Sequence, residues 1–529
     1  MPIRSPLALL ASLSVALPFV FGYSQPPSPN FWPVLASWAC AWALAAWALA
    51  QAQWGAAWTR GGWAAVWSRG LVIAALLGAA VGLVQFFAGD VGWSPWIQPS
   101  TPGQAIGNLR QRNQQATLLS LGTWALLWVV GRWQERWQAE PTRRWVGLLA
   151  GLLLAWALLL LAVASAATAS RTGALQWALL LALLWMWRRS LGGLPGLPFG
   201  LAVVGLVLYV AASWLLPILL EQWTGFPADR LFSRFADDGQ GCGGRRVLWS
   251  NVAYLIAQKP WTGWGWGELD YAHYTTLFPG TRFCVLLDNA HDLPLHLAVE
   301  LGLPVAVLAT GGVLAWVLRA RPWREADPVR QLAWGVLALI GLHSLLEFPL
   351  WYGPFQVTAL LAVLLLWRGG WGARGSGAVR GLGAAALAAA LAAGCYAAWD
   401  YGRVALLYQP VALRPAALRE DTWAKVRGTR LFSSQVDFAH VTTTPVTPAN
   451  ALQIHGMAQQ LLHFSPEPRV IEPLIESAAL LGLDDEAAFH LKRYRLAYPE
   501  AYARWARGHA RFRPAPGTAP PGADRPQSR

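Results

Sequence analysis

The stretch WVGLLAGLLLAWALLLLAVASAATASRTGALQWALLLALLWMW (Trp145–Trp187) contains two long apolar runs, and a short polar turn separates them. Neither run carries a charged residue. Because a helix of roughly 20 apolar residues crosses the hydrocarbon core of a bilayer, each run has the length and composition expected of a membrane span. The turn TASRTG (Thr168–Gly173) is very short. The stretch therefore predicts a transmembrane helical hairpin.

The rest of the chain repeats this pattern. Of its 529 residues, 55% are hydrophobic and 13% are charged, whereas about 25% of the residues of a soluble protein are charged. We therefore expect an all-α polytopic membrane protein with about 11 (10–13) transmembrane helices. The first run is expected to be retained as a span and not cleaved as a signal peptide. The runs lie near 7–22, 32–52, 64–88, 115–131, 145–166, 173–187, 198–220, 293–318, 331–348, 352–367 and 381–399.

Arginine is distributed unevenly among the connections between these runs. Every second connection is rich in arginine, and the short connections between them contain little. Because short loops rich in Lys and Arg stay in the cytoplasm, the alternation predicts a cytoplasmic N-terminus and places the other connections outside. The formal charge of +14 then reflects topology and does not indicate a nucleic-acid surface. The arginine-rich connections include Arg60, Arg132, Arg143, Arg188, Arg319, Arg330, Arg368 and Arg380.

Two external segments are large. The alternation predicts an external loop at 221–290 within a transmembrane domain at 1–399, followed by an external helical extension at 400–508. The extension either recognises an acceptor or braces the large loop. The Pro/Gly-rich end at 509–529 is predicted to be disordered. Amphipathic helices are expected at 449–464 and 470–508.

Cysteines fall in two environments. Cys242 and Cys284 both lie in the large external loop, where an oxidising exterior permits a disulfide. A bridge and two free thiols both remain open. Cys40 and Cys395 lie within predicted spans, where we expect inert packing residues.

A polar segment, GNLRQRNQQATLLSLG (Gly107–Gly122), leads into the fourth run. Its side chains at Gln111, Arg112 and Asn113 exceed what a helix start requires to satisfy its free N–H groups. They are therefore candidates for ligand binding, with an ordinary helix start as the alternative.

Three arginines on the external side are candidates for binding an anion. Arg171 is the only charge in TASRTG, where the topology rule disfavours it, although an Arg at a helix end can also snorkel to the interface. Arg245 and Arg246 begin an amphipathic helix in the large loop, ahead of a turn rich in Trp and Gly. Guanidinium suits phosphate because its planar fork bonds two oxygens at once.

The segment LDNAHDLPLHLAVELG (Leu287–Gly302) places His291 where the external loop gives way to an apolar run. A titratable imidazole at the edge of a membrane span is a functional-site candidate. No Cys/His set has metal-ligand spacing, so no metal site is predicted. A base beside arginines suits transfer of a group away from a phosphate, with His taking a proton and Arg the developing charge. His296, five residues on, is expected to pack or hydrogen-bond.

These motifs together resemble a known family. The segments around His291, Asn113, Arg171 and Arg245, with HSLLEFPLWYGPF (His343–Phe355), are similar to the PglL-type protein O-oligosaccharyltransferases. That family belongs to the superfamily of O-antigen ligases and Wzy polymerases. The resemblance covers about 100–360 and implies a bacterial inner-membrane enzyme with a periplasmic C-terminus. Its implied reaction moves an oligosaccharide en bloc from undecaprenyl pyrophosphate to Ser or Thr of a pilin-like protein, without metal or nucleotide.

The resemblance also implies roles for residues. His291 would be the catalytic base, and Arg171, Arg245 and Arg246 would hold the pyrophosphate. The glycolipid would be bound with help from Gln111, Arg112 and Asn113. Asp292 stands where the family often has Asn.

Three further positions are less sharply defined. His343 and Glu347, spaced i,i+4, would form either a buried pair or a glycolipid contact. Tyr271 is expected near an acceptor or sugar pocket.

Two other functions stay open. An O-antigen ligase or Wzy-type polymerase would run the same chemistry on a sugar acceptor. A multi-pass transporter would place polar groups near mid-span, whereas here they cluster on one predicted face.

Overall fold

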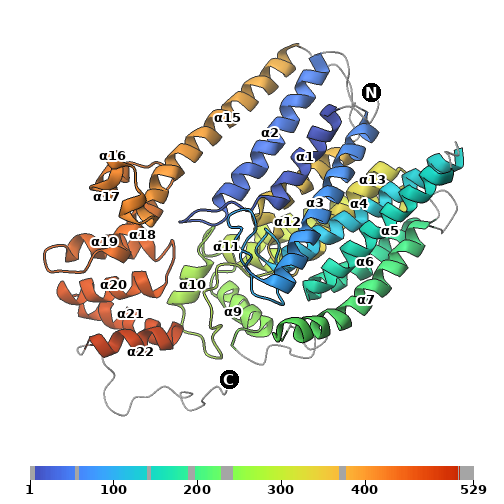
Figure 1. The fold of residues 1–529 in the computed structure, drawn as a ribbon. Coiled ribbons are helices and arrows are strands. Elements are labelled where there is room, and N and C mark those ends of the chain that lie inside the picture. Colours follow the sequence, from blue (N-terminus) through green and yellow to red (C-terminus); the bar gives the residue numbers. More distant parts are fainter. Residues whose placement is uncertain are drawn as a thin grey trace. The chain divides into compact units, whose positions relative to one another are not determined.

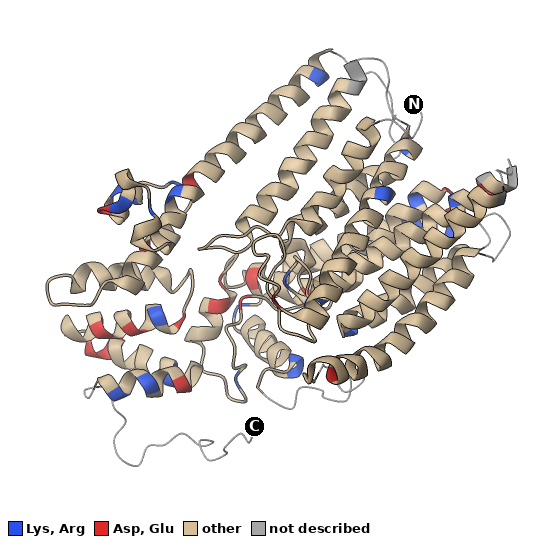
Figure 2. Cartoon of the chain, in the orientation of Figure 1, with Lys and Arg blue, Asp and Glu red and all other residues tan. Residues whose placement is uncertain are grey.

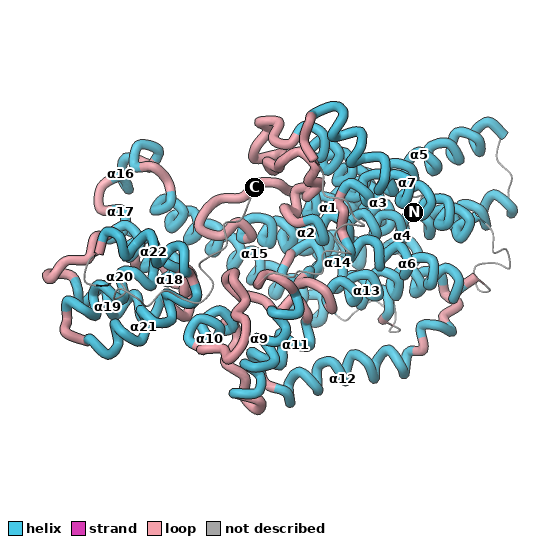
Figure 3. Tube along the Cα trace, turned by 90° about the horizontal axis from the view of Figure 1, so that it is seen from below, coloured by secondary structure: helices cyan, strands magenta, loops and turns pink. Residues whose placement is uncertain are grey.

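The computed structural model describes residues 6–53, 59–139, 144–188, 197–227, 242–367, 377–509 and 512. Within these ranges the chain is built from helices joined by loops, with no strand (Figure 3). The predicted all-α class is thus confirmed for the described part of the chain. Several features predicted above lie outside it: Arg143, Arg368, the 228–241 part of the large loop, and 509–529 apart from His509 and Phe512.

The chain divides into two compact units. The first comprises Met1–Asp238, His291–Pro294 and Leu308–Trp399. The second comprises Gly239–Ala290, Leu295–Val307 and Asp400–Arg529. The second unit therefore joins most of the predicted external loop to the predicted external extension.

The helices of the first unit are long and apolar (Figure 1). Six helical segments in the described residues are long and apolar enough to span a membrane: Phe31–Ala50, Arg60–Ala88, Trp145–Ala167, Leu197–Thr224, Leu303–Arg324 and Gly377–Tyr408. The chain is therefore a multi-pass membrane protein. The helices are α1 (Pro6–Val20), α2 (Phe31–Gln53), α3 (Arg60–Ala88), α4 (Arg112–Ala139), α5 (Arg144–Ala167), α6 (Arg171–Trp187), α7 (Leu197–Thr224), α12 (Leu303–Ala320), α13 (Pro328–Ser344), α14 (Gly353–Leu366) and α15 (Gly377–Ala405).

The lengths of these helices follow from where charge and apolar residues lie. Figure 2 shows Lys, Arg, Asp and Glu mostly near the ends of the long helices, with little charge along their middles. Apolar side chains remain exposed on α5, for example Leu152 and Trp156, at 68% and 65%. In water such exposure would be costly, but lipid accepts it. These helix faces are suited to hydrocarbon.

Helix α4 lies at the centre of the first unit. It packs against α3, α5, α6, α7 and α13, and every side chain from 114 to 127 is buried. Among the buried polar side chains at the beginning of this helix, Gln115 Nε2 donates to the Gly78 carbonyl over 2.7 Å, whereas the side-chain polar atoms of Gln114 have no hydrogen-bond partner among the described residues. This position makes the start of α4 the natural centre of a polar site.

The predicted single run at 293–318 is wrong. The structure divides it into α11 (Leu293–Leu301) and α12, with Gly302 between them at φ +85°. A left-handed residue cannot continue a right-handed helix, and glycine adopts that conformation readily. The membrane-spanning segment therefore begins at Leu303, and α11 precedes it.

The second unit contains short helices. The loop supplies α9 (Arg245–Gln258) and α10 (Leu269–Thr275). Most of α11 also belongs to this unit. The predicted helix at 470–508 is broken into three, because Gly482 has φ +74° and Pro499 cannot continue α21. The extension consists of α16 (Ala416–Arg419), α17 (Thr422–Val426), α18 (Ser433–Thr443), α19 (Ala451–Leu461), α20 (Pro468–Leu480), α21 (Asp484–Ala497) and α22 (Pro499–Gly508).

Loop and extension are connected by polar contacts inside the second unit. Tyr274 of α10 stacks on His490 of α21, and its hydroxyl lies 3.2 Å from His490 Nδ1. Arg493 Nε donates to the Thr275 carbonyl over 2.7 Å. These contacts show that the extension braces the α10 segment of the loop, which was one of the two roles expected for it.

Candidate functional site

His291 is oriented by a carboxylate. Its Nδ1 lies 2.7 Å from Glu347 Oε2, and its ring meets Phe348 edge-on with the centroids 5.1 Å apart. The His291 side chain is 29% exposed and that of Glu347 is 7% exposed. The imidazole is thus fixed at one nitrogen while part of its surface stays accessible. A carboxylate on Nδ1 sets the tautomer of the ring and stabilises its protonated form.

The backbone at His291 is itself unusual, with φ +52°. A non-glycine residue in this region costs about 1–3 kcal/mol, and such residues gather at functional sites. Ala169 and Arg110 share the feature, at φ +46° and +60°. His291, Ala169 and Arg110 each stand two residues before the start of a helix (α11, α6 and α4, respectively), so three segments at the site have constrained backbones.

A second pair of residues continues the network from Glu347. Asn113 Nδ2 donates to Glu347 Oε1 over 2.9 Å, and Asn113 Oδ1 accepts from Ser170 Oγ over 2.7 Å. Ser170 also caps α6, because its Oγ accepts the Gly173 N–H over 3.1 Å. The starts of α4 and α6 are thereby tied to the base.

His343 and Glu347, whose i,i+4 spacing suggested a pair on one helix, do not share a helix. Helix α13 ends at Ser344, so Glu347 lies in the following turn and contacts His291. His343 is fully buried, and its Nδ1 lies 2.8 Å from Thr117 Oγ1. Gln176 Nε2 donates to the same Thr117 oxygen over 2.8 Å. His343 thus belongs to a buried polar cluster with Thr117 and Gln176.

The residues predicted to bind the glycolipid differ in their contacts and their exposure. Gln111 Oε1 accepts the Gln114 N–H over 2.8 Å, so Gln111 caps α4, as the helix-start alternative required. Arg112 is the first residue of α4 and is partly exposed. Arg171 is the first residue of α6, directly after buried Ser170, and is also partly exposed. Of these residues, Arg112 and Arg171 are the partly exposed cations at the starts of their helices.

Arg245 and Arg246 are the first residues of α9 in the second unit, as predicted. The glycine-rich segment after α9 forms a turn that leads into α10. A Cβ on Gly263 would lie 2.3 Å from the Glu300 carbonyl, and one on Gly302 would lie 2.3 Å from the Trp261 carbonyl. These glycines allow two backbones to pack together at the start of α12.

Tyr271 has one ring face covered within the second unit. It stacks on His463 with centroids 3.9 Å apart, and His463 Nδ1 lies 2.7 Å from Glu268 Oε2. His296 Nε2 lies 3.4 Å from Glu300 Oε2, with both side chains buried. His296 is therefore a buried residue packed beside the Glu300 carboxylate, and packing was one of the two roles expected for it.

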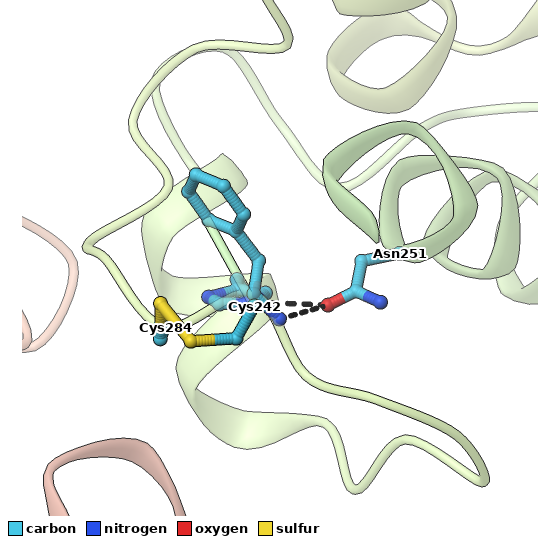
Figure 4. The surroundings of a disulfide bond; sticks show 5 residues. Cys242, Asn251 and Cys284 are labelled. Atoms are coloured by element: carbon cyan, nitrogen blue, oxygen red, sulfur yellow. Dashed lines mark hydrogen bonds between the residues drawn. A yellow bond between two sulfur atoms is a disulfide. The ribbon is translucent and has the colours of Figure 1, made fainter. Parts of the chain in front are cut away.

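Cys242 and Cys284 form a disulfide in the structure (Figure 4). Their Cα atoms are 5.3 Å apart. Asn251 of α9 lies beside the bridge, and its Oδ1 accepts the Phe283 N–H over 2.9 Å. The bridge and this hydrogen bond hold the segment before His291 against α9.

Asp270 is the most perturbed acid of the loop. Burial raises its pKa from 3.8 to about 7, and the nearby carboxylates of Asp288 and Glu268 act in the same direction. The Tyr271 N–H, which donates to Asp270 Oδ1 over 2.7 Å, opposes the rise in pKa. Asp270 thus titrates near neutral pH in the second unit.

No group of three or more His, Cys, Asp and Glu side chains in the described ranges could hold a metal ion. In the first unit, His291, Glu347, Asn113 and Ser170 form one hydrogen-bonded site. Sequence reasoning missed its two connecting elements, the Glu347–His291 contact and Ser170. The serine had a signal in the sequence, since Ser170 stands three residues before Gly173 in the position of a helix cap.

Three segments of the chain match families of known proteins. Residues 105–129 match the family "Protein glycosylation ligase", 156–310 match "O-Antigen ligase", and 331–512 match "Virulence factor membrane-bound polymerase, C-terminal". The General O-oligosaccharyltransferase of Acinetobacter baylyi (strain ATCC 33305 / BD413 / ADP1) is 30% identical over 114 residues, which is 21% of this chain. The chain spans 19% of the length of that relative. No solved structure matches. These matches make the chain similar to the O-antigen ligase superfamily and support a member of the PglL type.

Proposed function

We propose that this protein is a protein O-oligosaccharyltransferase. It transfers an oligosaccharide en bloc from undecaprenyl pyrophosphate to a Ser or Thr hydroxyl of a pilin-like acceptor, on the periplasmic face of the inner membrane. The observation that carries this proposal is the pair in which His291 Nδ1 lies 2.7 Å from Glu347 Oε2. Asn113, in the segment that matches protein glycosylation ligases, donates a hydrogen bond to the same Glu347. About eleven spans and a cytoplasmic N-terminus complete the proposed topology.

The base acts through its second nitrogen. With the Nδ1 proton directed at Glu347, the neutral ring presents its lone pair at Nε2. Nε2 accepts the proton of the acceptor hydroxyl as that oxygen attacks C1 of the first sugar. Glu347 then stabilises the imidazolium that forms, as the acid does in a Ser-His-Asp site. General-base assistance of this kind accelerates a reaction by roughly 10²–10⁴-fold.

The arginines act on the leaving group. The bond between C1 and the pyrophosphate oxygen breaks as the new C1–O bond forms, and the electron pair leaves with undecaprenyl pyrophosphate. Arg171, Arg245 and Arg246 are assigned to hold that pyrophosphate and to take up its developing charge. Arg112 and Tyr271 are assigned to the glycolipid or acceptor.

A sugar acceptor is the second candidate. The match of 331–512 to a membrane-bound polymerase favours a Wzy-type polymerase or an O-antigen ligase, which share the donor and the base. The matched protein glycosylation ligase segment at 105–129 favours a protein acceptor. Only the nature of the attacking hydroxyl differs between the two.

The test is glycosylation in living cells. The full-length protein is co-expressed with a pilin and a lipid-linked glycan, and pilin mass is measured by intact mass spectrometry. We expect a glycan on pilin with the wild type and none with His291→Ala at equal expression. Sugar polymer or lipid A–linked glycan, without modified pilin, would overturn the protein acceptor in favour of the second candidate.

A further inference from the structure

Glu347 needs two anchors to direct its carboxylate. It lies in the turn after α13, where no helix fixes its side chain. One oxygen, Oε2, faces His291 Nδ1, and the other, Oε1, accepts from Asn113 Nδ2 over 2.9 Å. A carboxylate held at only one oxygen can rotate about its last bond. Asn113 therefore helps to direct the Glu347 carboxylate.

The Asn113 amide is in turn oriented from α6. Ser170 Oγ accepts the Gly173 N–H, so its single proton is available to donate to Asn113 Oδ1 over 2.7 Å. This contact holds the amide oxygen toward Ser170 and the amide nitrogen toward Glu347. Every hydrogen bond from Gly173 to Glu347 thus runs in one direction, and the last acceptor faces the Nδ1 proton of His291.

The proposal concerns Asn113, and it rests on the function proposed above. We propose that Asn113 is a positioning residue for the catalytic base and not a glycolipid ligand, and that Ser170 connects it to Arg171. Each polar end of its amide makes a hydrogen bond within the protein, and these two bonds orient it toward Glu347. Arg171 follows Ser170 directly at the start of α6. A pyrophosphate held by Arg171 therefore favours the Ser170 position that aligns the base.

The first test separates turnover from binding. Purified full-length protein in nanodiscs is assayed with undecaprenyl-pyrophosphate oligosaccharide and pilin. We expect Asn113→Ala to lower kcat about tenfold or more, with donor KM within about twofold of wild type. Asn113→Asp keeps the shape but cannot donate from an ionised oxygen, and we expect a similar loss. A raised donor KM with unchanged kcat would show a glycolipid ligand and overturn the proposal.

A double-mutant cycle tests the connection to Glu347. If Asn113 acts through Glu347, Asn113→Ala costs little further once Glu347→Gln has been made, so the losses are not additive. Independent roles would give multiplied losses and would refute the connection. Thermal unfolding of each variant checks that it is folded, and Asn113→Asp replaces Asn113→Ala if the alanine variant is not.

The serine link has its own matched controls. We expect Ser170→Ala to lower kcat and Ser170→Thr, which keeps the hydroxyl, to restore it. Ser120→Ala removes a buried hydroxyl of α4 that has no hydrogen-bond partner among the described residues, and it should leave kcat unchanged. Equal rates for Ser170→Ala and Ser120→Ala would overturn the link. If His291→Ala were fully active, the proposed function would fail, whereas activity of Asn113→Ala beside inactive His291→Ala would defeat only this inference.

Discussion

Glu347 and His291 are 56 residues apart in the chain, yet Glu347 Oε2 lies 2.7 Å from His291 Nδ1. The carboxylate comes from the turn after α13, and the imidazole from a residue with φ +52° just before α11. Two irregular segments thus meet at the start of α4, where Asn113 donates a hydrogen bond to Glu347. The pairing explains how a histidine at a membrane edge gains a fixed tautomer and a charge partner.

The charge of Glu347 should matter more than its shape. Glu347→Gln keeps the size of the side chain but cannot stabilise an imidazolium. We expect its kcat for glycan transfer to fall by about 10²–10⁴-fold. The measurement is initial rate with purified protein, with donor KM as the internal control. A glutamine variant that turns over at the wild-type rate would show that Glu347 has only a structural role.

Arg171 should require its guanidinium geometry. Arg171→Ala removes a pyrophosphate contact, and we expect at least about a tenfold loss of transfer efficiency, kcat/KM. Lysine restores the charge but not the planar fork, so Arg171→Lys should recover only part of that efficiency. Titration of the lipid donor in the same assay gives both values. A lysine variant indistinguishable from wild type would argue against bidentate binding.

The disulfide should stabilise the second unit. The bridge between Cys242 and Cys284 closes a segment with a sequence separation of 42. Chain-entropy reasoning gives a stabilisation of ~4 kcal/mol for a loop of this length. We expect the double serine variant to unfold at a lower temperature, and reduction to lower the Tm of wild type alone. Mass spectrometry under non-reducing conditions that found two free thiols would contradict the bridge.

Asp270 should make the second unit more stable at acidic than at neutral pH. The unfolded carboxyl loses its proton near pH 4, whereas the folded one keeps it up to about pH 7. The folded state thus binds more protons between these values, so its stability falls as pH rises from about 4 to about 7. Asp270→Asn removes this penalty, which is on the order of a few kcal/mol.

The measurement is the Tm of full-length Asp270→Asn and wild-type protein at pH 5 and pH 8. We expect the variant to gain more over wild type at pH 8. An equal difference at the two pH values would mean that Asp270 ionises normally.

Much of this arrangement was predictable, since periodic apolar runs and turn residues act locally. The α9 helix after Gly244 and its end before Lys259–Pro260 follow from capping and proline chemistry. The breaks at Gly302 and Gly482 were missed, because glycine within an apolar run gives no local sign that its φ will be positive. At Gly302 the backbone of Trp261 packs too closely for a Cβ, whereas a Cβ at Gly482 would meet nothing within 4 Å.

The site was predictable in its residues but not in its connections. His291 and Arg171 stood out because polar groups at membrane edges are costly. The contact of Glu347 with His291 was hidden, since i,i+4 spacing suggested a pair with His343 on one helix. The end of α13 at Ser344 redirects Glu347, and that end depends on the tertiary fold around η2 (Pro349–Trp351).

The central claim is that His291 is the base that activates the acceptor hydroxyl. Single-turnover transfer by purified protein, with radiolabelled undecaprenyl-pyrophosphate oligosaccharide and pilin, tests it most directly. We predict that His291→Ala binds the lipid donor as tightly as wild type and transfers its glycan about 10²–10⁴-fold more slowly. Transfer by the folded, donor-loaded His291→Ala protein at the wild-type rate would contradict the claim.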